Sequence, residues 1–119
     1  MKTVKYILML YQDEAGFWFK LTQSEQQRAI ADYGAFTSAM EEAGVLRDTN
    51  RFQPYYTATT VRIADGKPQV ANQPYWDSKE QLGGYFIIEV PDQDVAISWA
   101  VRCPAASHGV VEVRPLETR

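Results

Sequence analysis

The chain has 119 residues, of which 45% are hydrophobic, 13% are aromatic and 23% are charged. These proportions exclude a disordered or fibrous protein, and the length predicts a single domain over residues 1–119. The formal net charge is -3, and the lysines and arginines are scattered. The chain therefore lacks the basic patch that nucleic-acid binding requires, and no nucleic-acid partner is expected.

The N-terminal segment, residues 4–11, predicts a buried strand. Lysines precede its apolar run, as in a signal peptide, but polar residues interrupt the run after Tyr11 and no small-residue cleavage site follows. No other apolar stretch reaches the roughly 18 residues that a membrane span requires. We therefore expect a cytoplasmic protein without membrane contact. The single cysteine, Cys103, cannot form an internal disulfide and agrees with this location.

A long amphipathic helix is predicted next. Thr22 and Glu25 have the T-x-x-E spacing of a capping box, and Gly44 is typical of a helix C-terminus. Apolar residues recur between them at helical spacing. They are Ile30, Tyr33, Phe36 or Thr37, and Met40. The aromatic residues 17–19 before this helix either staple onto it or cover the mouth of a cleft.

The middle of the chain predicts a strand and a hairpin. Residues 45–52 are a weaker strand candidate, because charged and amide residues interrupt them. β-branched residues over 57–63 precede the Asp65-Gly66 dipeptide, which favours a tight type I′ turn. The return strand should be short and end at Ala71.

The C-terminal third predicts a strand, a helix and a last strand. Residues 84–90 are the strongest strand and should lie at the centre of the sheet. Pro91 and Asp92 open a second helix, which Pro104 stops. Its apolar face comprises Ala96, Trp99, Ala100 and Cys103. Residues 110–114 form the last strand.

With the hairpin set aside, this order is the split βαβ pattern of an α+β, ferredoxin-like fold. Both helices should cover one face of the sheet. The other face then carries apolar side chains, either Tyr6 with Leu8 or Ile7 with Met9, depending on the register. Because such a face seldom stays in water, we predict a homodimer whose sheets pack face to face and enclose a small cleft.

Three segments resemble YCII-related proteins, and more narrowly their DGPF branch. They are KYILMLYQDE at residues 5–14, KEQLGGY at 79–85 and CPAASHGVVEVRP at 103–115. The resemblance implies a ferredoxin-like dimeric α/β barrel. Where the branch carries Asp-Gly-Pro-Phe, this chain has Asn72, Gln73, Pro74 and Tyr75. An asparagine cannot take up a proton near neutral pH, so an acid or base role of that aspartate would be lost here. If the aspartate only shapes the loop, Asn72 can replace it as a turn residue.

His108 is the only histidine and becomes the first candidate for a catalytic proton carrier, because its ordinary pKa lies near neutrality. The His-Gly pair before the last strand also resembles the DGPF branch. The alternative is a loop histidine that bonds the backbone or fills a gap. A thiol nucleophile at Cys103 is not expected.

Six further residues are candidates for binding a small anionic or aromatic ligand. They are Arg114, Glu112, Lys79, Asn72, Tyr75 and Trp76. Glu112 and Arg114 should share a strand face, where they bind a ligand or form an interface salt bridge. Lys79 follows the motif loop and is equally explained by a solvated turn. Of the adjacent aromatics Tyr75 and Trp76, one should pack on the core and the other line a pocket or the partner subunit.

Two functions follow as hypotheses. The first is a dimeric small-molecule enzyme that resembles YCII-type dehydrochlorinases, lyases or isomerases and needs no cofactor. The second is a non-catalytic binding or regulatory module, because DGPF-type domains are associated with sigma-factor-type transcription control. One histidine and one cysteine cannot build the usual zinc site, so no metal is expected.

Overall fold

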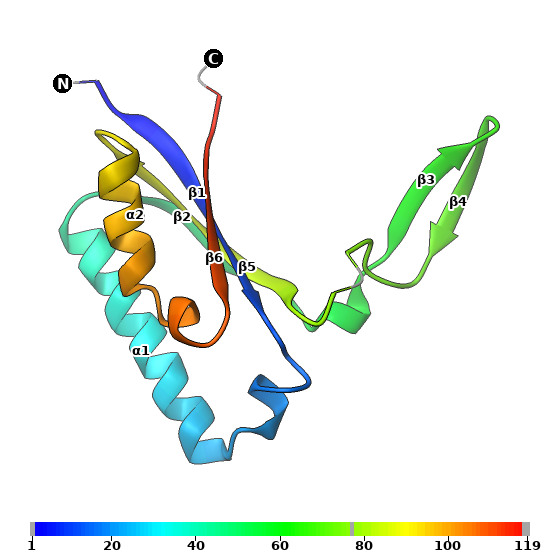
Figure 1. The fold of residues 1–119 in the computed structure, drawn as a ribbon, viewed down its shortest axis with the longest axis horizontal. Helices are drawn as coiled ribbons and strands as arrows, with labels where there is room; N and C mark the ends of the chain where they lie inside the picture. The colour runs from blue at the N-terminus through cyan, green and yellow to red at the C-terminus, as the bar shows by residue number, and fades with distance from the viewer. Residues whose placement is uncertain (1, 77, 118–119) are drawn as a thin grey trace.

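The computed structural model describes residues 2–76 and 78–117 (Figure 1). Within these residues, a sheet of four antiparallel strands has the order β2-β5-β1-β6. The strands are β2 at Leu46–Arg51, β5 at Gln81–Val90, β1 at Val4–Gln12 and β6 at Val110–Pro115. Helices α1 at Gln23–Glu42 and α2 at Gln93–Arg102 cover one face of the sheet. The predicted α+β, ferredoxin-like fold is therefore confirmed.

The caps of both helices follow from the sequence. In α1, the Glu25 backbone N–H donates to Thr22 Oγ1 over 3.1 Å, and the Thr22 N–H donates to Glu25 Oε1 over 2.9 Å. This reciprocal pair is the predicted capping box. Gly44 has a φ of 73° after the last turn of α1. In α2, Asp92 Oδ1 accepts the Val95 N–H over 3.0 Å, so both helix starts lie where predicted.

The alternation of β1 decides which of its residues form the core. Tyr6 and Leu8 are buried under the helices, at 5% and 0% exposure. Ile7 and Met9 are only partly buried and lie on the opposite, open face. From the helices, Phe36, Met40 and Trp99 complete this packing. The open face is therefore the one that carries Ile7 and Met9.

Strand β5 lies at the centre of the sheet, as predicted, but begins at Gln81 instead of Gly84. The pairing with β1 shifts register between Leu10 and Tyr11, opposite the Gly83-Gly84 pair. A Cβ on Gly84 would lie 2.9 Å from the Asn50 carbonyl oxygen. Glycine at this position therefore lets β2 approach β5 closely, and the strand continues through both glycines.

The inserted hairpin is an arm that projects away from the sheet (Figure 1). Strands β3 at Thr60–Ala64 and β4 at Lys67–Ala71 pair around Asp65 and Gly66, whose φ angles of 51° and 76° fit the predicted type I′ turn. The predicted start of β3 at residue 57 is wrong, because Tyr55–Thr57 forms a 3₁₀ turn, η2.

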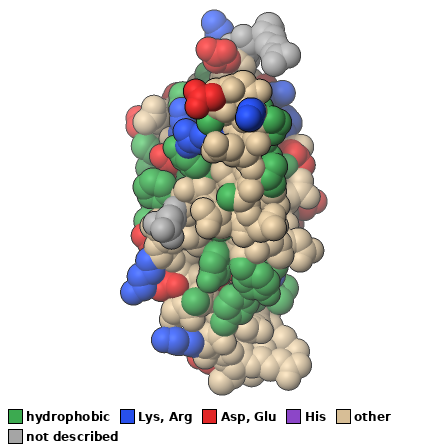
Figure 2. Space-filling view, turned by 90° about the vertical axis from the view of Figure 1, so that its right-hand side faces the viewer, with side chains coloured by type: hydrophobic (Ala, Val, Ile, Leu, Met, Phe, Trp, Pro, Cys, Tyr) green, Lys and Arg blue, Asp and Glu red, His purple; other side chains and the backbone are tan. Residues whose placement is uncertain are grey.

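The arm leaves large apolar side chains in solvent. The exposed fraction is between 62% and 64% for Val61, Ile63 and Val70 of the arm and for Tyr56 of η2, which precedes the arm. Figure 2 views the molecule from the side of the arm and shows hydrophobic side chains on that surface. A two-stranded hairpin is marginally stable by itself in water, and these side chains add to the apolar surface that the protomer leaves exposed.

Within the described residues, no helix combines the length and the apolar character needed to cross a membrane.

Candidate functional site

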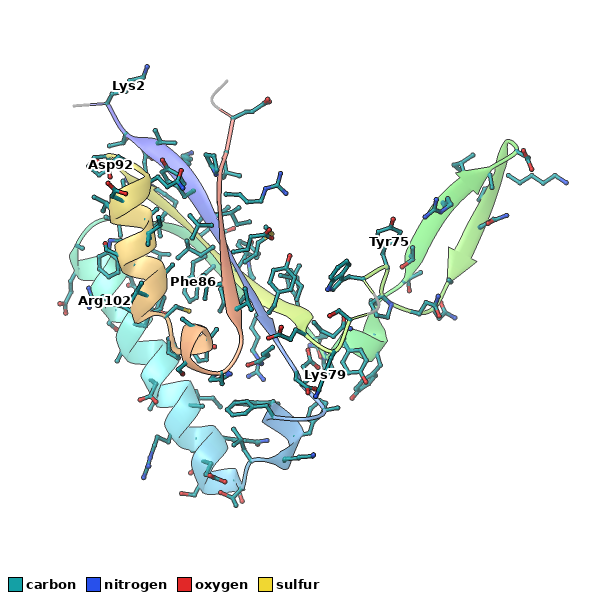
Figure 3. All side chains as sticks on the ribbon, viewed as in Figure 1. Lys2, Tyr75, Lys79, Phe86, Asp92 and Arg102 are labelled. Carbon is teal, nitrogen blue, oxygen red and sulfur yellow. The ribbon has the colours of Figure 1, made fainter. Side chains whose placement is uncertain are left out.

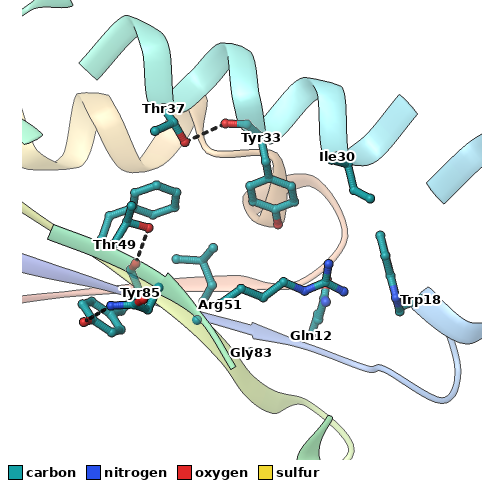
Figure 4. Close-up of a pocket in the computed structure, with 13 residues that line it drawn as sticks. Gln12, Trp18, Ile30, Tyr33, Thr37, Thr49, Arg51, Gly83 and Tyr85 are labelled. Atoms are coloured by element: carbon teal, nitrogen blue, oxygen red, sulfur yellow. Dashed lines mark hydrogen bonds between the residues drawn. The ribbon is translucent and has the colours of Figure 1, made fainter. Parts of the chain in front are cut away.

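A cavity of about 220 Å³ lies between α1 and the helix-facing side of the sheet (Figure 4). We call it the inner hollow. Its walls are mostly apolar or aromatic and come from β1, the 3₁₀ turn η1 at Trp18–Lys20, α1, β2 and β5. The lining residues are Leu10, Gln12, Trp18, Ile30, Tyr33, Thr37, Thr49, Asn50, Arg51, Gly83, Gly84, Tyr85 and Phe86.

Two further hollows continue the cavity toward the arm. The middle hollow, about 330 Å³, shares Gln12, Trp18, Arg51 and Gly83 with the inner one and adds Glu14. The outer hollow, about 730 Å³, is lined by the segment from Arg51 to Thr60 and by the loop after β4. Arg51 lines all three hollows. We call the three together the Arg51 groove.

Arg51 is the last residue of β2 and lies opposite Gly84 of β5. Its Cζ lies 4.7 Å from the centroid of the Trp18 ring, a cation–π geometry. Among the described residues, the ion pairs join Arg47 to Glu89 and Lys79 to Asp13, so Arg51 has no carboxylate partner there. The guanidinium therefore lies against an aromatic ring, and its N–H groups have no hydrogen-bond partner in residues 2–76 and 78–117.

Several polar side chains of the inner hollow are used inside the protein, among them Asn50, whose Nδ2 donates to the Tyr85 hydroxyl over 2.9 Å. Thr37 Oγ1 donates to the Tyr33 carbonyl over 2.8 Å, and Thr49 Oγ1 donates to the Tyr85 carbonyl over 2.9 Å. Within the described part of the chain, the side chains of Gln12, Tyr33 and Arg51 make no hydrogen bond. These three side chains are available to a ligand.

The Tyr33 hydroxyl is a neutral donor at physiological pH. Burial raises its pKa strongly, nearby Cys103 adds to the effect, and the positive charge of Arg51 opposes it. Figure 4 shows this hydroxyl directed toward the side chain of Arg51. The inner hollow thus offers a phenol and a guanidinium on adjacent walls.

Ile30 and Trp18 form the rim of the inner hollow. Ile30 was predicted on the apolar face of α1 but is 54% exposed, because it borders the hollow and does not pack on the sheet. Trp18 lies in η1 and borders the same end of the hollow as Ile30 (Figure 4). Of the two roles expected for residues 17–19, covering a cleft mouth is the one that Trp18 fits.

His108 lies outside the residues that line the Arg51 groove. Its ring stacks on Phe17, with centroids 4.1 Å apart and planes inclined by 13°. Nδ1 is buried and has no hydrogen-bond partner among the described residues. Burial lowers the pKa of His108, and a backbone hydrogen bond opposes the shift. The imidazole is therefore neutral at physiological pH.

Glu112 and Arg114 lie on the open face of the sheet. In the register of β1 with β6 they oppose Met9 and Ile7, whereas Val111 and Val113 pack against the core. The Tyr11 hydroxyl donates to Glu112 Oε1 over 3.2 Å. Burial and this hydrogen bond raise the pKa of Tyr11. Both charged residues are thus separated from the Arg51 groove by the sheet.

The four candidates around the motif loop divide into two pairs. Tyr75 and Trp76 line the outer hollow, while Asn72 is exposed at the end of β4 and Lys79 Nζ lies 3.8 Å from Asp13 Oδ2 (Figure 3). The expectation that one of the two aromatics packs on the core is wrong. Tyr75 is 74% exposed and Trp76 is 60% exposed, because their loop lies at the base of the arm.

The structure therefore brings Tyr75 and Trp76 to the groove of Arg51 and leaves the other predicted site residues elsewhere. The sequence reasoning missed Arg51, Tyr33 and Gln12. Arg51 ends an irregular strand, and Tyr33 fits the apolar pattern of α1, so neither stands out. A polar tip on the core-facing side of a predicted helix, as in Tyr33, was the available signal.

Comparison with known proteins places the chain in a family. The family described as YCII-related domain matches residues 4–118. An uncharacterized protein of Rhizobium meliloti (strain 1021), R00369, is 34% identical over 115 residues, which cover 93% of this chain and 90% of the relative. The match spans the sheet, both helices and the arm. This chain belongs to the YCII-related domain family.

Proposed function

We propose that this YCII-related protein binds a small organic molecule in the Arg51 groove and acts as a homodimer. The observation that carries the proposal is the inner hollow: a largely apolar cavity in which Gln12, Tyr33 and Arg51 offer unused polar groups. Small-molecule sites have this composition, with apolar walls and a few polar groups that orient the ligand.

The dimer is supported by surfaces that one protomer leaves open. Ile7, Met9 and Ile87 lie on the open face of the sheet and are only partly buried. The arm adds its exposed apolar side chains to this surface area. Exposed apolar surface of this kind is typical of association sites, and a second copy with the same open face is the expected occupant.

Filling the inner hollow should abolish ligand binding. Thr37 lies on the wall of the hollow, whereas Ser38 beside it is exposed. In a thermal-shift screen of single-ring acids, amides and alcohols, at least one compound should raise the melting temperature of the wild-type protein. Thr37→Met should lose that shift, because its longer side chain occupies the cavity. Ser38→Met, with the same new side chain in solvent, should keep it.

Two results would contradict the proposal. One is that no compound of the panel stabilises the wild-type protein. The other is that Thr37→Met and Ser38→Met respond alike to every compound that does.

Proton transfer by His108 is a second candidate function, and one observation supports it. Its buried Nδ1 has no hydrogen-bond partner among the described residues, so the neutral imidazole has a free site for a proton. The regulatory role remains the alternative hypothesis. Because His108 is not among the residues that line the Arg51 groove, a substrate of His108 would have to bind elsewhere, whereas the regulatory role requires only binding in the groove.

The pH dependence of stability tests the environment of His108. Because burial holds its pKa in the folded protein below the ordinary value of 6.5, the neutral form stabilises the fold. That contribution is fully present above pH 6.5 and is lost as the pH falls through the folded-state pKa. An NMR titration should give a pKa below 6.5. Urea unfolding should show a smaller acid-induced loss for His108→Gln, and equal losses in both proteins would refute this assignment.

A further inference from the structure

The inner hollow has a single charged wall residue. Arg51 is the only one of its lining residues that carries a charge at neutral pH, since burial keeps the Tyr33 phenol neutral. The described residues place no carboxylate in ion-pair contact with this guanidinium. A ligand in the inner hollow therefore meets one positive charge that no carboxylate of these residues contacts, which favours an anion.

The contact with Trp18 leaves the hydrogen-bonding edge of Arg51 open. A guanidinium stacks on an aromatic ring through its flat face, while its N–H groups point outward in the same plane. The Cζ-to-ring distance of 4.7 Å fits this arrangement. The free edge has the fork geometry that binds a carboxylate through two parallel hydrogen bonds.

Glu14 fixes which way such a ligand enters. Its side chain lines the middle hollow, is 6% exposed, and accepts the Tyr55 backbone N–H at Oε2 over 3.2 Å. A second anion beside this buried carboxylate is disfavoured. The anionic end must therefore stay at Arg51, and the body of the ligand must extend into the inner hollow, where no acidic residue lines the wall.

The walls and the volume of the inner hollow determine which kind of ligand body fits there. Leu10, Trp18 and Phe86 supply apolar and aromatic surface, and Tyr33 and Gln12 supply polar groups at the margin. The cavity holds about 220 Å³, below the roughly 300–1,000 Å³ of sites for drug-sized ligands. A single ring fits this space better than a fused or extended ligand.

From these observations we infer that the inner hollow is a site for a single-ring aromatic carboxylate, with its carboxylate on Arg51 and its ring between Trp18 and α1. This inference rests on the proposed function and specifies the ligand class of the same groove. Neither the predicted candidates Glu112 and Arg114 nor His108 takes part in it.

The test compares benzoate with its neutral isostere benzamide by isothermal titration calorimetry. Wild-type protein should bind benzoate more tightly than benzamide, and added sodium chloride should weaken benzoate binding. Arg51→Gln should weaken benzoate binding by roughly tenfold or more, because a charge-assisted bidentate contact is removed. It should weaken benzamide binding much less, because the neutral amide loses no charge-assisted contact. Arg51→Lys should give an intermediate loss, since it keeps the charge without the fork.

Arg47→Gln is the matched control. Arg47 lies on the same strand but pairs with Glu89 over 3.1 Å and lines none of the three hollows. It should bind benzoate as the wild type does. Melting temperatures of all variants establish that each is folded.

The possible failures are distinguishable. Equal binding of benzoate and benzamide, both lost in Thr37→Met, would refute the carboxylate class and leave the binding function standing. Benzoate binding that survives Arg51→Gln would refute the role of Arg51. If wild-type protein binds neither compound while another class in the thermal-shift panel binds at Thr37, the aromatic carboxylate is the wrong ligand. Absence of any binding would overturn both proposals.

Discussion

Replacing Leu8 with alanine should lower the free energy of unfolding by about 2–5 kcal/mol. Leu8 is 0% exposed and lies in the core cluster with Phe36, Met40 and Ile88. The truncation removes apolar contacts on every side, and the close-packed neighbours relax only in part, so a cavity remains. Urea unfolding at a fixed protein concentration measures this loss.

The adjacent residue provides the matched comparison. Ile7 lies next to Leu8 on β1 but points to the open face of the sheet. Ile7→Ala should therefore cost each protomer little and instead raise the dissociation constant of the dimer by roughly tenfold, equivalent to about 1.4 kcal/mol. Light scattering coupled to size-exclusion chromatography, over a dilution series, measures that constant.

Together, the Leu8→Ala and Ile7→Ala variants test separately which face of β1 forms the core and whether the protein is a dimer. If Ile7→Ala destabilised the protomer as much as Leu8→Ala, the two faces of β1 would be equally buried and the assigned core would be wrong. A wild-type protein that runs as a 119-residue monomer over the whole dilution series would instead refute the homodimer.

A Gly109→Ala substitution should destabilise the protein by about 1–3 kcal/mol. Gly109 precedes β6 where the backbone passes close to β1, and an added Cβ would overlap the Tyr11 carbonyl oxygen. The neighbour is backbone, so the clash is relieved only by displacing a strand. Because His108 is the preceding residue, we expect its stacking on Phe17 to loosen as well, visible as changed imidazole chemical shifts.

Gly34→Ala is the control with the opposite sign. Gly34 lies inside α1, and an added Cβ there would meet nothing within 4 Å. Alanine has the higher helix propensity, so this variant should gain about 0.5–1 kcal/mol. Chemical denaturation of both variants gives the comparison. A Gly109→Ala protein as stable as the wild type would mean that β6 tolerates the displacement, contrary to the packing described.

Local sequence patterns were sufficient to predict the helices, strands and turns of the fold. The capping box at Thr22 and Glu25, the turn at Asp65 and Gly66, and the Asp92 cap are short-range devices, and each lies where expected. The stability of such caps and turns depends on a few neighbouring residues, so the local sequence is nearly enough to predict where they form. Strand ends were less predictable. Residues 57–59 resemble a strand, yet the 3₁₀ turn at Tyr55–Thr57 postpones β3 to Thr60.

The candidate site was much less predictable, because it depends on residues that are distant in the chain. Trp18, Tyr33 and Arg51 come from η1, α1 and β2 and meet only when the helix packs on the sheet. Conversely, His108 and Arg114 are close in sequence but are not brought to one site: His108 stacks on Phe17, and Arg114 lies on the open face.

The sequence by itself determined the family, the α+β order of the elements and the alternation that places Glu112 and Arg114 opposite the two valines. Only the tertiary structure decided that Leu8 faces the helices and Ile7 the open face, because alternation leaves the choice of face unspecified. It also decided that Arg51 has Trp18 beside it and, among the described residues, forms no ion pair with a carboxylate. That pairing depends on how the strands and η1 come together in space, which no local pattern encodes.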